Sequence, residues 1–309
     1  MSIGLCCQYL EPIVKKSGKT EYQNILNERN LQYGQFLNNK YSNNEIHQVW
    51  INNVNNLFSA VKKIQSEGFK VFRVSSNLFP LYDSLTDMLK SSDEIKSVLK
   101  KIGSFALENS IRLTTHPDQF VVISSNNPSI IAKSIKMLDH HAWIFDSMGL
   151  PESSYYAINI HGGAKNNSDV LVQSIKTLKP NVRSRLTLEN DERSYSVANL
   201  FEVYSQTGVP VLFDSHHHAF NEDGMSGEEA FDKSCSTWGS IKPLTHLSNT
   251  EPGMENGSFT ERRKHSDYVH YIPDYQLKSN NNNQIDIEFE FKMKNLAITK
   301  AVKDFGINL

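Results

Sequence analysis

The sequence has few of the features that mark a secreted, membrane-spanning or disulfide-bonded protein. It contains three cysteines in 309 residues, two of them adjacent, and these form neither a disulfide framework nor a paired CxxC zinc site. No apolar run approaches the roughly 18 residues that cross a membrane. Residues 1–7 lack the charged region and the apolar core of a signal peptide. We therefore expect a cytoplasmic protein in a reducing compartment, with no membrane partner.

An excess of charge of one sign is also absent. The chain has 32 Lys and Arg and 34 Asp and Glu, a formal net charge of −2, which argues against a generally basic nucleic-acid binder. Three common site motifs are missing as well: the GxxxxGK[ST] phosphate loop, the GxSxG nucleophile turn and the HExxH zinc helix. Net charge still leaves the partner open, because carboxylates gathered around divalent ions are offset by the charge of the ions.

Predicted strands and helices alternate along most of the chain. Apolar residues recur at helical spacing over 46–67, and further helices are predicted at 84–109, 128–148 and 169–178. Strands separated by helices pair in parallel, and eight of them imply a closed barrel. We therefore predict an α/β fold, a (β/α)₈ TIM barrel that forms one domain over 1–309. The eight predicted strands cover 2–9, 69–74, 111–115, 155–160, 185–188, 209–213, 244–247 and 285–290.

Two polar segments interrupt this alternation, and a polar, Asn-rich stretch precedes it. No element is assigned to the Asn-rich stretch between the first predicted strand and the helix at 46–67. Residues 250–260 are rich in Gly, Asn, Glu and Pro and are predicted as a long loop above the site-bearing face of the barrel. Residues 279–284 are predicted as a second polar loop before the last strand.

Eight side chains of metal-ligating type follow these predicted strands or lie in the loops beyond them. The carboxyl ends of parallel strands meet on one face of a barrel, so residues just after the strands converge there. A single His near a strand end is usually structural, but a whole set in the same relative place favours a metal centre. The set consists of His116, His161, Glu189, Asp214, His217, His246, His265 and Glu290.

The residue types narrow the chemistry of this centre. Imidazole and carboxylate ligands without thiolate suit Mn²⁺, Zn²⁺ or Fe²⁺, and eight ligands exceed the need of one tetrahedral ion, so we expect two or three ions. Clustered ions clamp a phosphodiester, generate a nucleophile and stabilise the leaving oxygen, which favours a phosphate ester as substrate. A sugar isomerase would use paired metals on the same barrel. Among the ligands, Glu189, Glu290 and His161 are the candidate catalytic residues.

Two features of the sequence each allow two interpretations. Strand alternation puts Asp286, Glu288 and Glu290 on one face, and that face lies either inside the barrel or in solvent. Gly162 and Gly163 directly follow His161. They either let the backbone come close to an ion or phosphate, or form an ordinary β–α turn.

A series of motifs resembles the UV damage endonucleases. Thr115–Val121 reads Thr-His-Pro-Asp-Gln-Phe-Val, and the family motif reads His-Pro-Gly-Gln-Tyr or Phe. The resemblance implies a TIM barrel related to endonuclease IV with a divalent cluster, most often Mn, with Zn, Co or Mg as the other candidates. It also implies incision of DNA immediately 5′ of pyrimidine dimers and (6-4) photoproducts, and at some other lesions such as abasic sites. Further similar segments follow in family order over nearly the whole chain: His161–Gly163, Leu188–Arg193, Asp214–His218, Thr245–Ser248, His265–Tyr268 and Glu290–Lys294.

The same resemblance assigns roles to single residues. All eight candidate ligands match the family's metal ligands. Gln119 and Phe120 match the pair that the family wedges into the duplex at the lesion, where a planar ring can fill the void left by flipped nucleotides. Leu5, in place of an N-terminal aromatic, and Lys292 complete the expected lesion-binding set.

One departure from the family concerns a modified lysine. The family commonly carries a Lys two residues before the ligand that matches His246, modified to a carbamate near the metals. That position is Leu244 here, and Lys242 lies four residues before His246 and would point differently.

The resemblance implies damaged double-stranded DNA as the partner, a monomer, and a place in the nucleoid or, in a eukaryote, in the nucleus. Three alternatives stay open. An endonuclease IV-like enzyme limited to abasic sites is disfavoured because that family usually has Asp where Arg263 precedes His265 by two residues. A xylose-isomerase-like sugar isomerase would keep the barrel and the metals. A lesion-binding protein without catalysis would fit if Leu244 marked decay of the centre.

Overall fold

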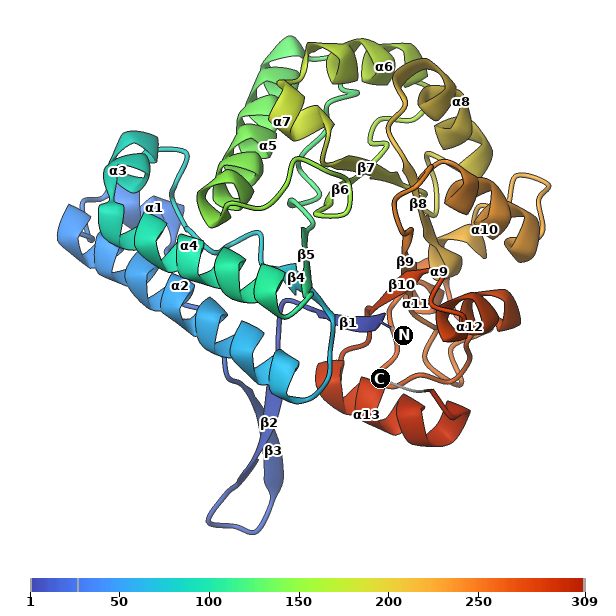
Figure 1. Ribbon diagram of the computed structural model, residues 1–309, viewed down its shortest axis with the longest axis horizontal. Coiled ribbons are helices and arrows are strands. Elements are labelled where there is room, and N and C mark those ends of the chain that lie inside the picture. Colours follow the sequence, from blue (N-terminus) through green and yellow to red (C-terminus); the bar gives the residue numbers. More distant parts are fainter. Residues whose placement is uncertain (1, 27, 308–309) are drawn as a thin grey trace.

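The computed structural model describes residues 2–26 and 28–307, and its centre is a closed barrel of parallel strands (Figure 1). The strand order around the barrel is β1-β10-β9-β8-β7-β6-β5-β4, with β4 pairing back onto β1. This confirms the predicted TIM barrel. The eight strands are β1 (Ser2–Cys6), β4 (Val71–Val74), β5 (Arg112–Thr115), β6 (Ile158–His161), β7 (Leu186–Glu189), β8 (Val211–Asp214), β9 (Leu244–Leu247) and β10 (Asp286–Phe289).

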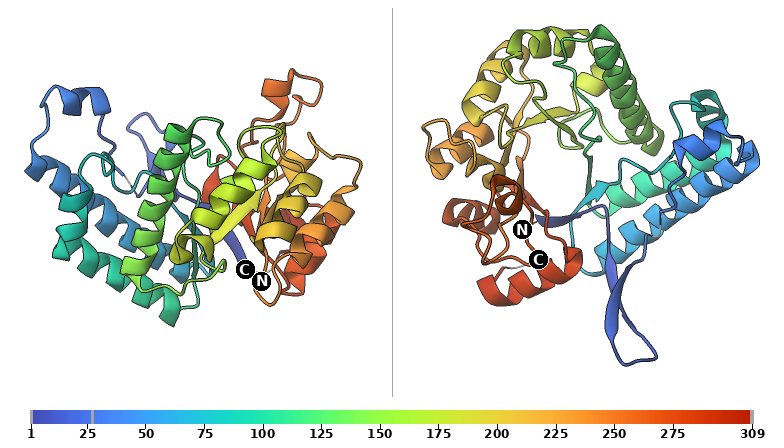
Figure 2. Two further views of the ribbon diagram at one scale, coloured as in Figure 1. Left: turned by 90° about the horizontal axis from the view of Figure 1, so that it is seen from above. Right: turned by 180° about the vertical axis from the view of Figure 1, so that it is seen from behind.

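Helices follow the barrel strands and surround the barrel (Figure 2). The segment that carries α11 rises above it (Figure 2, left), as predicted for the long loop at 250–260. Among the described residues, no helix is long and apolar enough to cross a membrane. The helices are α1 (Tyr33–Leu37), α2 (Asn43–Ser66), α3 (Thr86–Ser91), α4 (Asp93–Glu108), α5 (Pro128–Met148), α6 (Ser168–Thr177), α7 (Pro180–Arg183), α8 (Val197–Thr207), α9 (Ser215–His218), α10 (Gly227–Ser236), α11 (Phe259–Arg262), α12 (Asp274–Asn281) and α13 (Lys294–Phe305).

Local capping explains where the structure departs from the predicted elements. The single helix predicted at 84–109 is two helices, because Ser92 has an extended backbone and its hydroxyl accepts from the Ile95 amide, which starts α4 afresh. The first strand ends at Cys6 instead of residue 9, since Cys7 adopts a positive φ of 61°. The Asn-rich stretch before the helix predicted at 46–67, for which the sequence predicts no element, contains α1 and an antiparallel hairpin of β2 (Leu10–Val14) and β3 (Thr20–Asn24).

Alternate side chains along the barrel strands have different surroundings. Phe72, Val74 and Leu113 belong to the main hydrophobic core, which includes buried residues of the surrounding helices. Their neighbours Arg73 and Thr114 instead contact Glu288 of β10. Polar side chains from several strands therefore meet inside the barrel, below the loops that follow the strands.

A buried aromatic cluster beside α5 contains an unusual histidine. The His140 ring stacks on Tyr82 at a centroid distance of 3.5 Å and 6° between planes, and it also stacks near Trp143. Neither ring nitrogen of His140 has a hydrogen-bond partner among the described residues. Burial lowers the pKa of His140 well below its ordinary value, and burial likewise lowers the pKa of the adjacent His141 to about 4. Both rings are therefore neutral in the folded protein near pH 7.

We expect His140→Phe to stabilise the protein, and to do so more at pH 5 than at pH 8. Phenylalanine keeps the stack on Tyr82 and removes two buried nitrogens that lack partners. The unfolded chain takes up a proton at His140 below about pH 6.5 while the folded chain does not, so the wild type loses stability as pH falls through that value. Urea unfolding at both pH values measures the effect, and equal gains at pH 5 and pH 8 would contradict it.

Candidate metal centre

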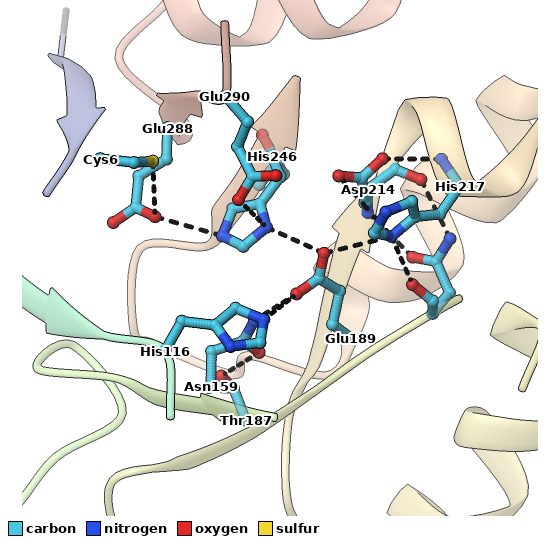
Figure 3. Close-up of polar contacts among 12 residues, drawn as sticks. Cys6, His116, Asn159, Thr187, Glu189, Asp214, His217, His246, Glu288 and Glu290 are labelled. Atoms are coloured by element: carbon cyan, nitrogen blue, oxygen red, sulfur yellow. Dashed lines mark hydrogen bonds and ion pairs between the residues drawn. The ribbon is translucent and has the colours of Figure 1, made fainter. Parts of the chain in front are cut away.

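Seven of the eight candidate ligands come together at the carboxyl ends of the barrel strands, and Figure 3 labels all of these except His161. They form three groups in which one ligand atom per residue lies within 4.8 Å of the others. Glu189 belongs to two of the groups and so does Asp214, so the three groups form a continuous row. The groups are His116–His161–Glu189, Glu189–Asp214–His217 and Asp214–His246–Glu290.

Asp214 and His217 are brought to one place by a helix cap. Asp214 ends β8 and caps α9, since its carboxylate accepts from the His217 amide at 2.8 Å. The amide side chain of Asn190 clamps the same backbone, because it accepts from the Asp214 amide and donates to the Asp214 carbonyl at 2.8 and 3.0 Å. A three-residue spacing in the sequence thus becomes a pair of adjacent ligands.

Three of the histidines are held by the same kind of hydrogen bond. Nδ1 lies 3.0 Å from the Pro117 carbonyl in His116, 3.0 Å from the Asn190 carbonyl in His217, and 2.7 Å from the Glu290 carbonyl in His265. A carbonyl oxygen only accepts, so Nδ1 carries the proton in each ring. Nε2 is then the ring atom that can bind a metal ion, and in His116 it lies 3.1 Å from a Glu189 oxygen.

Glu189 is the centre of the row. Its two carboxylate oxygens lie 3.1 Å from Nε2 of His116 and 3.0 Å from Nδ1 of His246. Burial alone would raise the pKa of Glu189, but the surrounding histidines, His246 and His161 first, outweigh burial and lower the pKa well below its ordinary value. Glu189 is therefore ionised in the folded protein and available to bridge two cations.

The sequence reasoning missed a buried arginine at this site. Arg73 extends from β4 to Glu290 at 2.5 Å and to Glu288 at 2.5 Å, and another of its contacts is Nε2 of His246 at 2.7 Å. Since a guanidinium only donates, Nε2 of His246 accepts and Nδ1 faces Glu189. The signal in the sequence was a basic residue near the end of the strand predicted at 69–74, which also contains Lys70.

The acidic face of the last strand lies inside the barrel. Glu288 is fully buried, and although burial would raise its pKa, Arg73 and His246 outweigh burial and bring the pKa to about 2. Asp286 lies deeper, where it pairs with Arg112 at 2.9 Å. Among the three acidic residues, Glu290 belongs to the metal-binding groups, and Glu288 instead pairs with Arg73.

Neither Leu244 nor Lys242 can supply a modified lysine to the centre. Leu244 is fully buried in a small apolar cluster that includes Val71 and Trp238. The Lys242 ammonium lies 2.6 Å from Asp286, at the opposite end of the strand from His246 and the metal-binding groups. The row of ligands therefore lacks the lysine carbamate that is common in the family.

The glycines after His161 are explained by contacts with protein. A Cβ on Gly162 would lie 2.3 Å from the ring of Tyr195, and Gly163 has a φ of +89° with Ser124 close by. Ser124 donates to the Gly162 carbonyl and accepts from the Ala164 amide. The turn is packed tightly against its neighbours, and this favours the interpretation as a β–α turn.

The residues expected to contact the lesion are placed differently from one another. Phe120 is 71% exposed and Gln119 beside it is exposed, and the two lie in a turn three and four residues after His116. Lys292 is exposed and lies 3.5 Å from Asp267. Leu5 has no exposed surface and packs in the hydrophobic core. The expectation that Leu5 contacts DNA is therefore wrong, because its side chain points away from solvent.

The donor set fits a cluster of divalent cations. Buried atoms that lack a hydrogen-bond partner among the described residues include Nδ1 of His161 and Oδ2 of Asp214, both in the row. A buried polar atom without a hydrogen-bond partner lowers the stability of the folded protein unless a bound ligand satisfies it. His265 lies at the rim, with Nδ1 3.8 Å from a Glu290 oxygen, and is outside the three groups.

Comparison with known proteins assigns the chain to a family. A family model described as UV-endonuclease UvdE matches residues 19–308. The chain belongs to this family. A UV DNA damage endonuclease of Nostoc sp. is 36% identical over 261 residues, which are 82% of this chain and 77% of the relative. A UV DNA damage endonuclease of Deinococcus radiodurans is 29% identical and covers 83% of this chain and 84% of its own length.

Solved structures agree with membership in the UvdE family. The crystal structure of SacUVDE superposes with a TM-score of 0.80 at 26% identity, over 99% of this chain and 98% of that one. An L-ribulose 3-epimerase superposes with a TM-score of 0.52 at 11% identity, which is similarity of fold alone. The ordered motifs thus identified the family correctly, and the sugar-isomerase alternative has no support beyond the shared barrel.

Proposed function

We propose that this UvdE family member is a metal-dependent DNA repair endonuclease that nicks the phosphodiester immediately 5′ of pyrimidine dimers and (6-4) photoproducts. The observation that carries the proposal is the row of three ligand groups linked by Glu189 and Asp214. A row of shared carboxylates holds cations near one another, as required to clamp one phosphodiester. The Gln119–Phe120 pair is exposed, and Gln119 lines a small pocket together with the ligands His116 and His161, so the pair can meet a distorted duplex beside the row.

The ligand row would hold two or three divalent ions, with Mn²⁺ as the first candidate. His116, His161 and Glu189 would bind one, and Glu189, Asp214 and His217 a second. Asp214, His246 and Glu290 offer a third place. The bound ions would polarise the scissile phosphate and lower the pKa of an attacking water. We propose that His265, at the rim of the row, is a further ligand of the outermost ion.

The chain's own residues contribute orientation and charge. Backbone carbonyls fix the rings of His116 and His217, so these ligands need no reorganisation when an ion binds. Arg73 holds Glu290 from the side opposite the solvent. We assign Glu189, Glu290 and His161 as the residues nearest to the reacting phosphate, since together they represent all three groups of the row.

Incision of a defined duplex tests this function. An end-labelled duplex with one pyrimidine dimer should be cut at the phosphodiester 5′ of the dimer in the presence of Mn²⁺, and parallel duplexes should carry a (6-4) photoproduct or an abasic site. Cutting of the abasic duplex alone would indicate an enzyme of narrower range. Failure to cut any of the three with Mn²⁺, Zn²⁺, Co²⁺ or Mg²⁺ would refute the proposal.

Gln119→Ala combined with Phe120→Ala is expected to weaken the preference for damaged over undamaged duplex about 5- to 150-fold. Base–aromatic stacking contributes about 1–3 kcal/mol per base, and each 1.4 kcal/mol corresponds to a factor of about ten. Competition binding on the two duplexes measures the preference, and metal analysis should find the ion content unchanged. Leu107→Ala, at an exposed apolar residue on α4, is the matched control.

A further inference from the structure

The β2–β3 hairpin stands away from the rest of the molecule. It projects outward between α2 and α13 (Figure 1). Its base is tied to α13, since the Asn295 side chain accepts from the amide of Leu10 and donates to its carbonyl, at 2.7 and 3.0 Å. Beyond that base, every residue of β2 after Leu10 and every residue of β3 before Asn24 is exposed. A two-stranded ribbon without a packed face is marginally stable by itself.

The tip of the hairpin is the part of the ribbon with the strongest charge. Residues 14–20 contain Lys15, Lys16 and Lys19 and no acidic residue. The Lys15 ammonium lies 2.9 Å from Glu21, whereas within residues 2–26 and 28–307 no carboxylate lies within ion-pair distance of Lys16 or Lys19. Val14 is 71% exposed and Tyr22 47% exposed on the same ribbon. The tip is a cationic surface on a protein whose net charge is −2.

The hairpin is continuous with the face of the barrel that carries the metal centre. A cavity of about 660 Å³ separates the ribbon from the barrel rim, and its wall includes Ile13 and Gln23 from the hairpin. On the barrel side the wall includes Cys7 and Ser75, which directly follow β1 and β4. These positions are carboxyl ends of strands, as are those of the ligands. A duplex that lies across the metal centre can therefore extend toward the ribbon.

We propose that the β2–β3 hairpin is a second DNA-binding element, which holds the duplex to one side of the lesion through its phosphates. The inference rests on the proposed function. The major groove of DNA is wide enough for a two-stranded ribbon, and lysines at the tip of the ribbon provide point charges for phosphate oxygens. Such contacts position the duplex and carry no information about the lesion. The hairpin thus strengthens binding of damaged and undamaged DNA alike, while Gln119 and Phe120 discriminate between them.

The salt dependence of DNA binding tests this role. Dissociation constants of the Mn²⁺-loaded full-length protein are measured at several salt concentrations for a dimer-containing duplex with a non-cleavable linkage 5′ of the dimer and for its undamaged counterpart. In Lys15→Ala/Lys16→Ala/Lys19→Ala, the slope of log K against log salt should become shallower by about 0.9 per lost phosphate contact. A loss of two or three contacts therefore changes the slope by about 2 to 3. The ratio of the two affinities should stay within about twofold, since the lost contacts are common to both duplexes.

A matched variant removes the same charge elsewhere. Lys96→Ala/Lys100→Ala/Lys101→Ala on α4 should leave the slope within about 0.5 of the wild type, because α4 lies on the outside of the barrel. Hydroxyl-radical footprinting should show protection that is shortened on one side of the dimer in the hairpin variant. An equal slope and an unchanged footprint in that variant, with the wild type still binding and cutting, overturn the inference alone. A wild type that binds neither duplex overturns the proposed function together with it.

Discussion

Glu189→Gln is expected to lower the rate of incision by about a thousandfold or more and to reduce the number of bound ions. Glu189 belongs to two of the three ligand groups. Glutamine has almost the same shape as glutamate but no charge, so this single substitution weakens two ion positions. A metal ion provides several kcal/mol of stabilisation to a phosphoryl transition state, and each 1.4 kcal/mol changes a rate about tenfold. Single-turnover incision and metal analysis of the dialysed protein measure the two effects.

Glu192→Gln is the matched control for this experiment. Glu192 is also a carboxylate near the centre, 3.8 Å from Nε2 of His217, but it is in none of the three ligand groups. Its amide variant should keep the wild-type ion content and most of the activity. DNA affinity should fall much less than incision in the Glu189 variant, because phosphate contacts away from the ions remain. Unchanged ion content in Glu189→Gln would show that the row is wrongly assigned.

Arg73→Met is expected to destabilise the protein by about 3–5 kcal/mol. The substitution leaves the carboxylate of Glu288 fully buried without its main counter-charge, and breaking one side of a buried ion pair has a cost of that size. Methionine keeps much of the apolar length of the side chain, so the lost volume contributes little. Urea unfolding of the metal-free protein at pH 7 measures the change in the free energy of unfolding.

A double-mutant cycle separates charge pairing from packing in this prediction. Glu288→Gln added to Arg73→Met should restore part of the lost stability, since the buried negative charge is then gone and the amide can still bond Thr114. Each single variant should be less stable than the double variant. Strictly additive losses would mean that Arg73 and Glu288 are not energetically coupled, in spite of the 2.5 Å between them.

The positions of the ligands along the chain could be predicted because they obey a simple geometric rule. Strand ends of a parallel barrel converge, so His116, Glu189 and Asp214 could be placed together without knowledge of any distance. Arg73 could not be found in that way, because it lies within a strand and reaches the site through its length across the barrel. Leu5 shows the opposite error, a residue that was included in the site although its side chain is buried elsewhere. Leu5 stands where the family has an N-terminal aromatic, which suggested contact with DNA, but the direction of a side chain within its strand decides whether it is buried.

The elements between the strands were predictable only where periodicity was strong. The long helix α2 is close to its predicted range because apolar residues recur along its whole length and Ser42 and Glu45 form a capping box at its start. The β2–β3 hairpin could not be predicted from periodicity. Nearly all of its residues are exposed, so it has no alternation of apolar and polar positions to detect.

Barrel closure has a consequence for how the protein is made. The first strand, β1, pairs with β4 and with β10, the last barrel strand in the chain, and Glu290 follows β10 directly. During translation His116, Glu189 and Asp214 leave the ribosome before β10. The nascent polypeptide cannot complete the cylinder of strands until β10 has left the exit tunnel. Translation therefore imposes an order in which the row of ligands is completed only after β10 and Glu290 have been synthesised.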